Sequence, residues 1–174
     1  YYNAAYTNCN ANYTGKGVDQ LGNIIKSLKE GEYSRRMIMC AWNPCQINEM
    51  ALPPCHVLVQ FHVTEGKKLS CSLYQRSGDI GLGVPFNIAS YSFLTHLLAH
   101  HCNLEAKEFV HHIGNAHIYD DHVESLKTQI KRKPYEYPKL KINKLCDKIE
   151  DYTLDNFEIE NYKYHPAISM KMRV

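Results

Sequence analysis

The chain has no long apolar run. None of its hydrophobic stretches approaches the roughly 20 residues of a transmembrane helix, and its first residues show no signal-peptide pattern. Its charge has no strong excess of one sign, because 20 Lys and Arg residues stand against 18 Asp and Glu residues. General nucleic-acid binding would call for a clustered basic face. We therefore predict no membrane partner and no obligatory nucleic-acid partner.

Several motifs of metal and nucleotide sites are also missing. The seven cysteines form no C-x-x-C pair, H-E-x-x-H does not occur, and the histidines between residues 111 and 122 share no consistent ligand spacing. The glycine-rich stretch 78–83 lacks both the Walker A sequence and a full G-x-G-x-x-G. We predict no metal site. The odd cysteine count favours a reducing compartment, the cytoplasm, with most thiols buried as small hydrophobes.

The 174 residues are enough for one sizeable core, and no linker or internal repeat divides them. Helical spacing is present over residues 18–28 and 85–101, with a more polar helix over 122–131. Strand patterns cover 37–42, 56–64, 69–75, 109–117, 140–142 and 168–172. These elements mix without regular βα alternation. They predict an α+β fold, with one layered domain over 1–174.

Residues 51–56 place a thiol directly after two prolines. Pro53 and Pro54 restrict φ and remove two backbone donors, so the chain enters Cys55 in a stiff, extended form. A nucleophile that must stay in one place gains from such stiffness. A buried cysteine after a Pro-Pro turn gives the same pattern, and these residues alone leave both interpretations open.

A predicted hairpin brings a cation toward this thiol. Strands 56–64 and 69–75 flank a turn at 65–68, and pairing about that turn puts Arg76 beside Cys55. A guanidinium there would favour the thiolate and, together with Ser77, could bind a phosphate. The alternative is an exposed strand end with a surface ion pair.

Two further pairs of residues are candidates for a nucleotide site. Arg35 and Arg36 precede a strand, and both reach one phosphate only if the backbone bends there; a solvated charge pair is the commoner outcome. His117 and Tyr119 alternate, which places both polar tips on one side of a strand, where they could hold a sugar hydroxyl or simply satisfy each other.

Read together, these stretches resemble thymidylate synthase from about residue 6 to the C-terminus. The resemblance rests on RR at 35–36, CAWNP at 40–44, MALPPCH at 50–56, QF at 60–61, LSC at 69–71, LYQRSGD at 73–79, GLGVPFNIASY at 81–91, GNAHIY at 114–119 and ISM at 168–170. It implies a mixed, mainly antiparallel sheet with flanking helices. The run from 74 to 91 is close to diagnostic of the family.

The resemblance implies reductive methylation of dUMP to dTMP, with 5,10-methylenetetrahydrofolate as co-substrate. Cys55 matches the nucleophile that adds covalently to C6 of uracil, and Asn87 matches the amide that hydrogen-bonds the base. Arg76 matches a phosphate-binding residue and His56 a supporting residue of the catalytic site. The addition creates an enolate at O4 of the base, which needs hydrogen-bond donors.

The remaining matches concern binding. The resemblance assigns dUMP to Arg35, Arg36, Cys55, His56, Gln75, Arg76, Ser77, Gly78, Asp79, Asn87, His117, Ile118 and Tyr119. It assigns the folate to Asp79, Leu82, Gly83, Phe86 and Arg173. It also implies a homodimer in which Arg35 and Arg36 reach into the partner subunit's site.

Two departures from the family pattern limit these expectations. The family's N-terminal segment is missing before Tyr1, so we expect a fragment that is inactive alone, and some family members are fused behind dihydrofolate reductase. Arg173 stands where the family usually has a small residue, so the C-terminal segment could close differently. Two alternatives remain: a non-catalytic dimerising or nucleotide-binding fragment, and a dCMP hydroxymethylase. The second would favour a carboxylate at Asn87.

Overall fold

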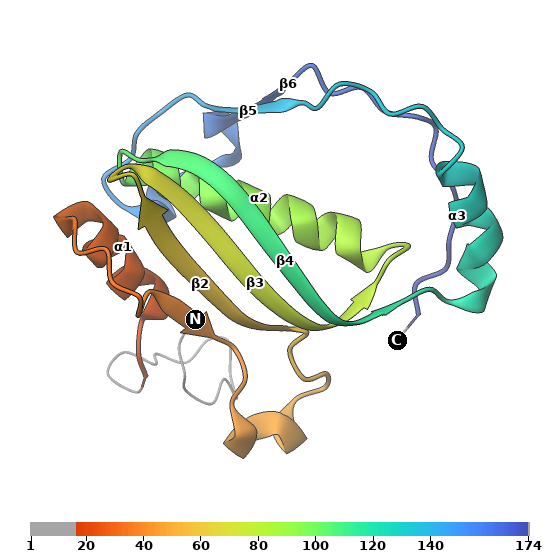
Figure 1. The fold of residues 1–174 in the computed structure, drawn as a ribbon, viewed down its shortest axis with the longest axis horizontal. Helices are drawn as coiled ribbons and strands as arrows, with labels where there is room; N and C mark the ends of the chain where they lie inside the picture. The colour runs from red at the N-terminus through yellow and green to blue at the C-terminus, as the bar shows by residue number, and fades with distance from the viewer. Residues whose placement is uncertain (1–16, 174) are drawn as a thin grey trace.

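A computed structural model describes residues 17–173 and contains a four-stranded sheet in the order β1-β2-β3-β4 (Figure 1). The strands are β1 (Ile38–Cys40), β2 (His56–Thr64), β3 (Lys68–Asp79) and β4 (Glu105–His117). β2 runs antiparallel to both β1 and β3, whereas β4 is parallel to β3. The α+β class and the mainly antiparallel sheet are therefore confirmed.

The β2–β3 hairpin forms about the predicted turn, with a shift in register between His56 and Leu58. Thr64 pairs with Lys68 across the turn, and His56 pairs with Gln75 at the other end. Glu65 and Gly66 have φ values of 54° and 70°, and these left-handed residues reverse the chain. β3 continues to Asp79, four residues beyond the predicted end, because its last residues pair with β4.

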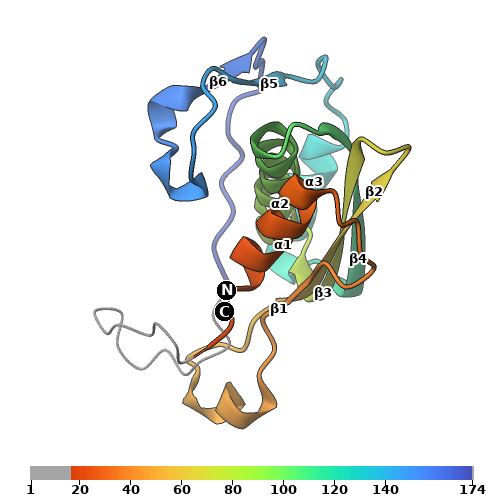
Figure 2. The same ribbon diagram turned by 90° about the vertical axis from the view of Figure 1, so that its left-hand side faces the viewer.

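Helices α1 (Gln20–Glu30) and α2 (Gly83–His101) lie on one face of the sheet, and no described helix covers the opposite face (Figure 2). Asp19 caps α1 by accepting a hydrogen bond from the Gly22 amide. The left-handed Gly31 (φ 73°) ends this helix. Apolar side chains from both helices and from the first three strands form the core: Ile24, Leu28, Met37, Met39, Val59, Phe61, Leu69, Cys71, Leu73, Tyr91 and Leu98.

Parallel pairing of β3 and β4 requires a crossover, and α2 supplies it. This connection brings the end of β3, the first turn of α2 and the end of β4 to the same end of the sheet. Among residues 17–173, no helix is long and apolar enough to cross a membrane.

The C-terminal third differs most from the sequence predictions. The polar helix is shorter than expected: a 3-10 turn η2 (Asp120–His122) precedes α3 (Val123–Gln129). β5 (Lys139–Ile142) pairs with β6 (Phe157–Glu160), which was not predicted. Three other 3-10 turns were not predicted either: η1 (Pro44–Glu49), η3 (Ile149–Asp151) and η4 (Leu154–Asn156).

The strand predicted at 168–172 is wrong. This segment pairs with no described strand and instead descends beside α3 to the ends of β3 and β4 (Figure 1). Its strand-like alternation has another cause. Ile168 and Met170 are half-buried, whereas Ser169 between them is exposed.

Candidate active site

A cleft of about 440 Å³ opens at the end of the sheet where β3 finishes and α2 begins. It is lined by Leu52, Cys55, His56, Gln75, Arg76, Ser77, Asp79, Gly83, Asn87, His117, Tyr119 and Arg173. These residues come from segments spread over more than a hundred positions of the sequence. All of them except Leu52 are residues that the sequence assigned to a site.

Arg76 holds the proline segment that precedes Cys55. Its Nε donates to the Pro54 carbonyl (3.0 Å), and one terminal nitrogen donates to the Pro53 carbonyl (2.7 Å). The Arg76 backbone amide donates to the Cys55 carbonyl (2.9 Å). The predicted proximity of Arg76 and Cys55 is therefore confirmed. A guanidinium has five N–H donors, so those not used on the prolines remain for a ligand.

Trp42 lies on the other side of this arginine. The guanidinium carbon is 5.9 Å from the centroid of the indole ring, within cation–π range. Arg76 thus contacts a ring and two carbonyls, and its side chain is among those that line the cleft.

Gln75 determines how Asn87 is oriented. The Gln75 side chain is 2% exposed, and its Nε2 donates to the Ser77 carbonyl (2.8 Å) and to Asn87 Oδ1 (2.9 Å). A carbonyl can only accept, so the first bond fixes which end of the Gln75 amide is the nitrogen. The His111 imidazole donates from Nε2 to Gln75 Oε1 (2.8 Å). Asn87 must therefore turn its oxygen inward, which leaves its NH₂ group as a donor toward the cleft.

His56 lies beside this network. Burial lowers its pKa, and a side-chain hydrogen bond with Asn87 partly offsets that effect. The edge of its ring meets Tyr91, with the centroids 5.1 Å apart. Burial also lowers the pKa of His111, which the nearby His56 and His112 lower further. The neutral forms of His56 and His111 are favoured, and the amide network is kept free of nearby imidazolium charge.

His117 and Tyr119 both line the cleft, as the sequence predicted, but strand alternation does not account for this. β4 ends at His117, and Tyr119 lies beyond it, at the start of η2. The two rings meet edge to face with centroids 5.2 Å apart. Their polar atoms can serve a ligand on this side of the cleft.

Asp79 closes the turn between β3 and α2. Its carboxylate accepts hydrogen bonds from the Gly81 amide (2.9 Å) and the Leu82 amide (3.3 Å) at the start of α2. A negative charge is favourable there because the helix N-terminus is the positive end of the helix dipole. Asp79 therefore presents a fixed carboxylate to the cleft.

Comparison with known proteins identifies the family of this chain. A family model described as thymidylate synthase matches residues 1–174. The chain belongs to the thymidylate synthase family.

Curated relatives agree. Over 172 residues the chain is 55% identical to a bifunctional dihydrofolate reductase-thymidylate synthase of Plasmodium chabaudi, covering 99% of the chain and 29% of that relative. It is 51% identical to the thymidylate synthases of Homo sapiens and Saccharomyces cerevisiae, covering all of the chain and 55% and 60% of these two relatives. The chain thus spans between 29% and 60% of the length of these relatives.

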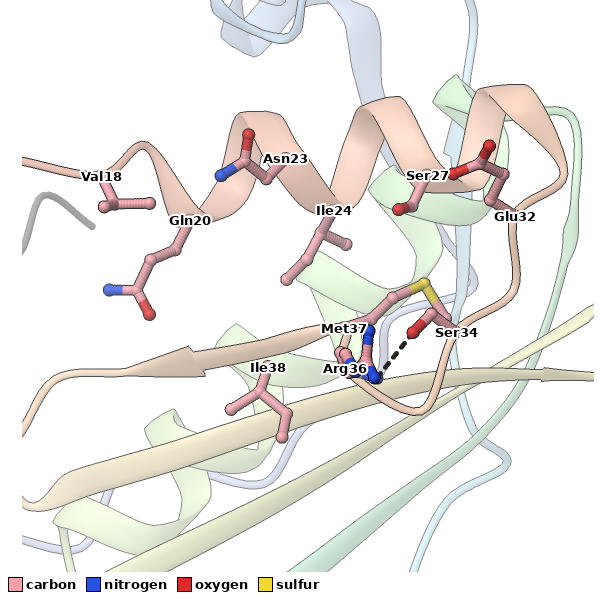
Figure 3. Close-up of a pocket in the computed structure, with 10 residues that line it drawn as sticks. All are labelled: Val18, Gln20, Asn23, Ile24, Ser27, Glu32, Ser34, Arg36, Met37 and Ile38. Carbon is pink, nitrogen blue, oxygen red and sulfur yellow. Dashed lines mark hydrogen bonds between the residues drawn. The ribbon is translucent and has the colours of Figure 1, made fainter.

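Several residues that the thymidylate synthase resemblance assigned do not line the cleft. Arg36 instead lines a second cavity of about 520 Å³ between α1 and β1, where its backbone amide bonds the Ser34 hydroxyl (Figure 3). Arg35 is exposed, and its carbonyl accepts from Gln60 on β2. Within one chain, neither arginine lies on the same cleft as Arg76.

Four other assigned residues lie near the cleft without lining it. Gly78 is buried in β3, where an added Cβ would lie 3.0 Å from both Ile113 and Val84. Leu82 and Phe86 flank the first turn of α2, and Ile118 is exposed between His117 and Tyr119. Phe86 is 72% exposed, which leaves an aromatic face open beside the cleft.

Three residues to which the sequence analysis assigned no role here contribute to this site. Leu52 lines the cleft, His111 supports Gln75, and the fully buried His122 lies behind Asp79. The Pro-Pro segment pointed to the region of Leu52. No local pattern marks either histidine, since each acts through tertiary contacts with distant segments.

The thiols differ in environment, as the sequence predicted in part. Burial raises the pKa values of Cys71 and Cys102 to about 11, and Cys146 is also buried. Cys55 is half-buried in the cleft, whereas Cys45 is exposed on η1. Cys9 lies outside the described residues. Within residues 17–173, no group of three or more His, Cys, Asp or Glu side chains is placed to hold a metal.

Proposed function

We propose that this chain carries the nucleophile and the nucleotide site for reductive methylation of dUMP to dTMP. Membership of the thymidylate synthase family supports this proposal, and so do the names of the relatives. One observation carries it: Cys55, Arg76 and Asn87 line a single cleft, and each is held there by contacts from other elements.

Cys55 is the nucleophile in this proposal. Its sulfur, as a thiolate, adds to C6 of uracil, and the electrons of the C5–C6 bond move through C4 to O4. Arg76, held against Pro53 and Pro54, supplies positive charge beside the thiolate and can donate to the phosphate. The sulfur leaves C6 again when the product forms, so the enzyme is regenerated.

Asn87 stabilises the charge that develops at O4. Its oxygen is bonded to Gln75, so its NH₂ group is free to donate to the enolate. Both Gln75 amide hydrogens are used inside the protein, and we therefore give Gln75 the task of orienting Asn87 rather than of contacting the base. The same orientation favours uracil over cytosine, because the cytosine 4-amino group is itself a donor.

The co-substrate 5,10-methylenetetrahydrofolate supplies the one-carbon unit and the hydride, and it leaves as dihydrofolate. Asp79 and Gly83 line the part of the cleft nearest α2, and the exposed Phe86 ring lies on the same helical turn. A fixed carboxylate and an open aromatic face fit a ring that carries N–H donors. Leu82 and Arg173 complete this side of the site.

The nucleotide's phosphate and sugar occupy the rest of the cleft. Arg76 and Ser77 bind the phosphate, and His117 and Tyr119 bind the ribose hydroxyl. Arg35 and Arg36 are exposed elsewhere on the chain, so we assign them to the site of a second copy in a homodimer. The free thiols of the described residues suit a reducing compartment, and we place the protein in the cytoplasm.

Tritium release from [5-³H]dUMP tests the proposal in the full-length protein. Cys55→Ser should lower the rate by more than about a thousandfold, because a hydroxyl is a far poorer nucleophile at neutral pH. Cys45→Ser is the matched control, since this exposed thiol lies outside the cleft, and it should release tritium at the wild-type rate. Release by Cys55→Ser at a rate close to wild type would remove Cys55 from the mechanism.

A further inference from the structure

The C-terminal segment 169–173 lies along η2 and α3, where side chains hold it at alternate residues. The contacts are Ser125 Oγ to the Ser169 carbonyl (3.4 Å), His122 Nε2 to the Lys171 carbonyl (2.7 Å) and Arg173 Nε to Asp121 Oδ2 (3.1 Å). Side chains of η2 and α3 thus take the place of a neighbouring strand.

His122 also lies close to Asp79, one of the residues that line the cleft. It is fully buried, and its Nε2 must carry a hydrogen because the Lys171 carbonyl can only accept. Its other nitrogen, Nδ1, has no hydrogen-bond partner among the described residues. That nitrogen lies 3.8 Å from Oδ1 of Asp79, the carboxylate that closes the turn before α2.

The surroundings of His122 allow this close approach. Gly81 lies in the turn between Asp79 and α2, and a Cβ on Gly81 would come within 2.9 Å of His122 Nδ1 and 3.3 Å of Met170 Sδ. The edge of the Tyr119 ring meets the imidazole, with centroids 5.5 Å apart. The charged groups around His122 are Asp79, from β3, and the Asp121–Arg173 pair.

We propose that His122 is a positioning residue that links the C-terminal segment to the Asp79 carboxylate. The imidazole donates to Lys171 at one end. At the other end, its Nδ1 lies 3.8 Å from Asp79 Oδ1, within ion-pair distance of that carboxylate. Docking of residues 169–173 and the orientation of Asp79 are therefore coupled. The consequence for catalysis rests on the proposed function, since Asp79 is there assigned to the folate.

Release of the C-terminal residues by a carboxypeptidase measures docking without any substrate. The protease acts on the undocked segment, so the rate reports the undocked fraction when docking is fast. His122→Gln keeps a donor for Lys171 and loses the link to Asp79, whereas His122→Asn does the reverse. Loss of either contact should raise the release rate by about two- to tenfold.

Changes at Asp79 test whether docking of the segment 169–173 depends on this carboxylate. Among the described residues, Asp79 accepts hydrogen bonds from the Gly81 and Leu82 amides and makes none to the segment itself. Asp79→Ala should raise the release rate by a similar factor. Asp79→Asn should raise the release rate less than Asp79→Ala, because its one amide oxygen can still accept from the Gly81 or the Leu82 amide. His165→Gln is the matched control: His165 also bonds a backbone carbonyl, that of Lys133, far along the chain from the cleft.

An unchanged release rate in Asp79→Ala, or in both His122 variants, would overturn the proposal. This outcome is distinct from failure of the proposed function, because the assay needs neither dUMP nor folate.

In the active protein, His122→Gln should raise KM for the folate co-substrate more than KM for dUMP. A purely structural defect would lower kcat and raise both KM values together.

Discussion

Arg76 and the pair Arg35–Arg36 are assigned to the same phosphate, yet they lie in opposite environments. Arg76 is fixed by two proline carbonyls and an indole ring, inside the cleft that contains Cys55. Arg35 and Arg36 are exposed beside β1 and share no cleft with Cys55. In the proposed function, one chain therefore supplies Cys55 and the base-binding half of the site, and Arg35 and Arg36 are assigned to the site of a second copy.

The largest effect is expected at the fixed arginine. Arg76→Ala removes a charge-assisted bond to the phosphate and also releases the Pro53–Pro54 segment that positions Cys55, so dUMP affinity should fall about a hundredfold. Arg76→Lys keeps the charge but cannot bond both carbonyls as a planar fork, and it should recover only part of the affinity. Calorimetric titration with dUMP measures both variants. Full recovery by Lys would mean that the clamp on the prolines does not matter.

Changes at the exposed arginines test the part of the phosphate site that is assigned to a second copy. Changing Arg35 or Arg36 alone to Ala should weaken dUMP binding about tenfold, the lower end for loss of one charge-assisted contact to the phosphate. A subunit with both changes, mixed with a Cys55→Ser subunit, should restore one working site per heterodimer of the full-length protein. If mixed dimers form and no tritium release returns, the two arginines do not act in the partner subunit's site.

In the proposed function, the choice between uracil and cytosine depends on Asn87, which lies in the same cleft as Cys55. Asn87→Asp replaces the inward-oriented amide by a carboxyl group, which can accept from the cytosine amino group and no longer donates to the uracil enolate unless protonated. The ratio of kcat/KM for dCMP to kcat/KM for dUMP should rise roughly five- to a hundredfold. This corresponds to a change of about 1–3 kcal/mol in the relative stabilisation of the two transition states. Steady-state kinetics with both nucleotides measure this ratio. An unchanged ratio would show that Asn87 does not read the base.

The pH dependence of stability should give a smaller effect. Burial lowers the pKa values of His56, His101 and His111 below 6.5, so the unfolded chain binds more protons than the folded chain. Their neutral forms stabilise the fold above pH 6.5, and this stability is lost as pH falls through the unfolded value toward the lowered ones. The melting temperature should therefore drop between about pH 7 and 5, and His111→Gln should make the drop shallower. A steeper drop in this variant would contradict the burial argument.

Sequence reasoning located the elements that depend on local pattern. The turn at 65–68 determines the β2–β3 register, and a shift of one residue between His56 and Leu58 then places Arg76 beside Cys55. Asp19 and Gly31 bound α1 in the same local way. The residues that line the cleft were found chiefly because their motifs resemble a known family.

The remaining contacts depend on tertiary structure that no local pattern encodes. Parallel pairing of β3 with β4 brings His111 to Gln75, although 36 positions separate them. The C-terminal segment alternates like a strand because one side packs inward, while the Lys171 carbonyl bonds to the side chain of His122. Neither histidine carries a motif, so the sequence alone could not assign their positions.

The central claim is that the cleft around Cys55 binds the nucleotide, and alkylation of this thiol tests it most directly. Iodoacetamide should modify Cys55 and Cys45 in the chain at about pH 8, while the buried Cys71 and Cys102, whose pKa values are about 11, react slowly. Peptide mass spectrometry gives each rate. Saturating dUMP should slow modification of Cys55 by at least about tenfold and leave Cys45 unchanged. Equal Cys55 rates with and without dUMP would contradict the account.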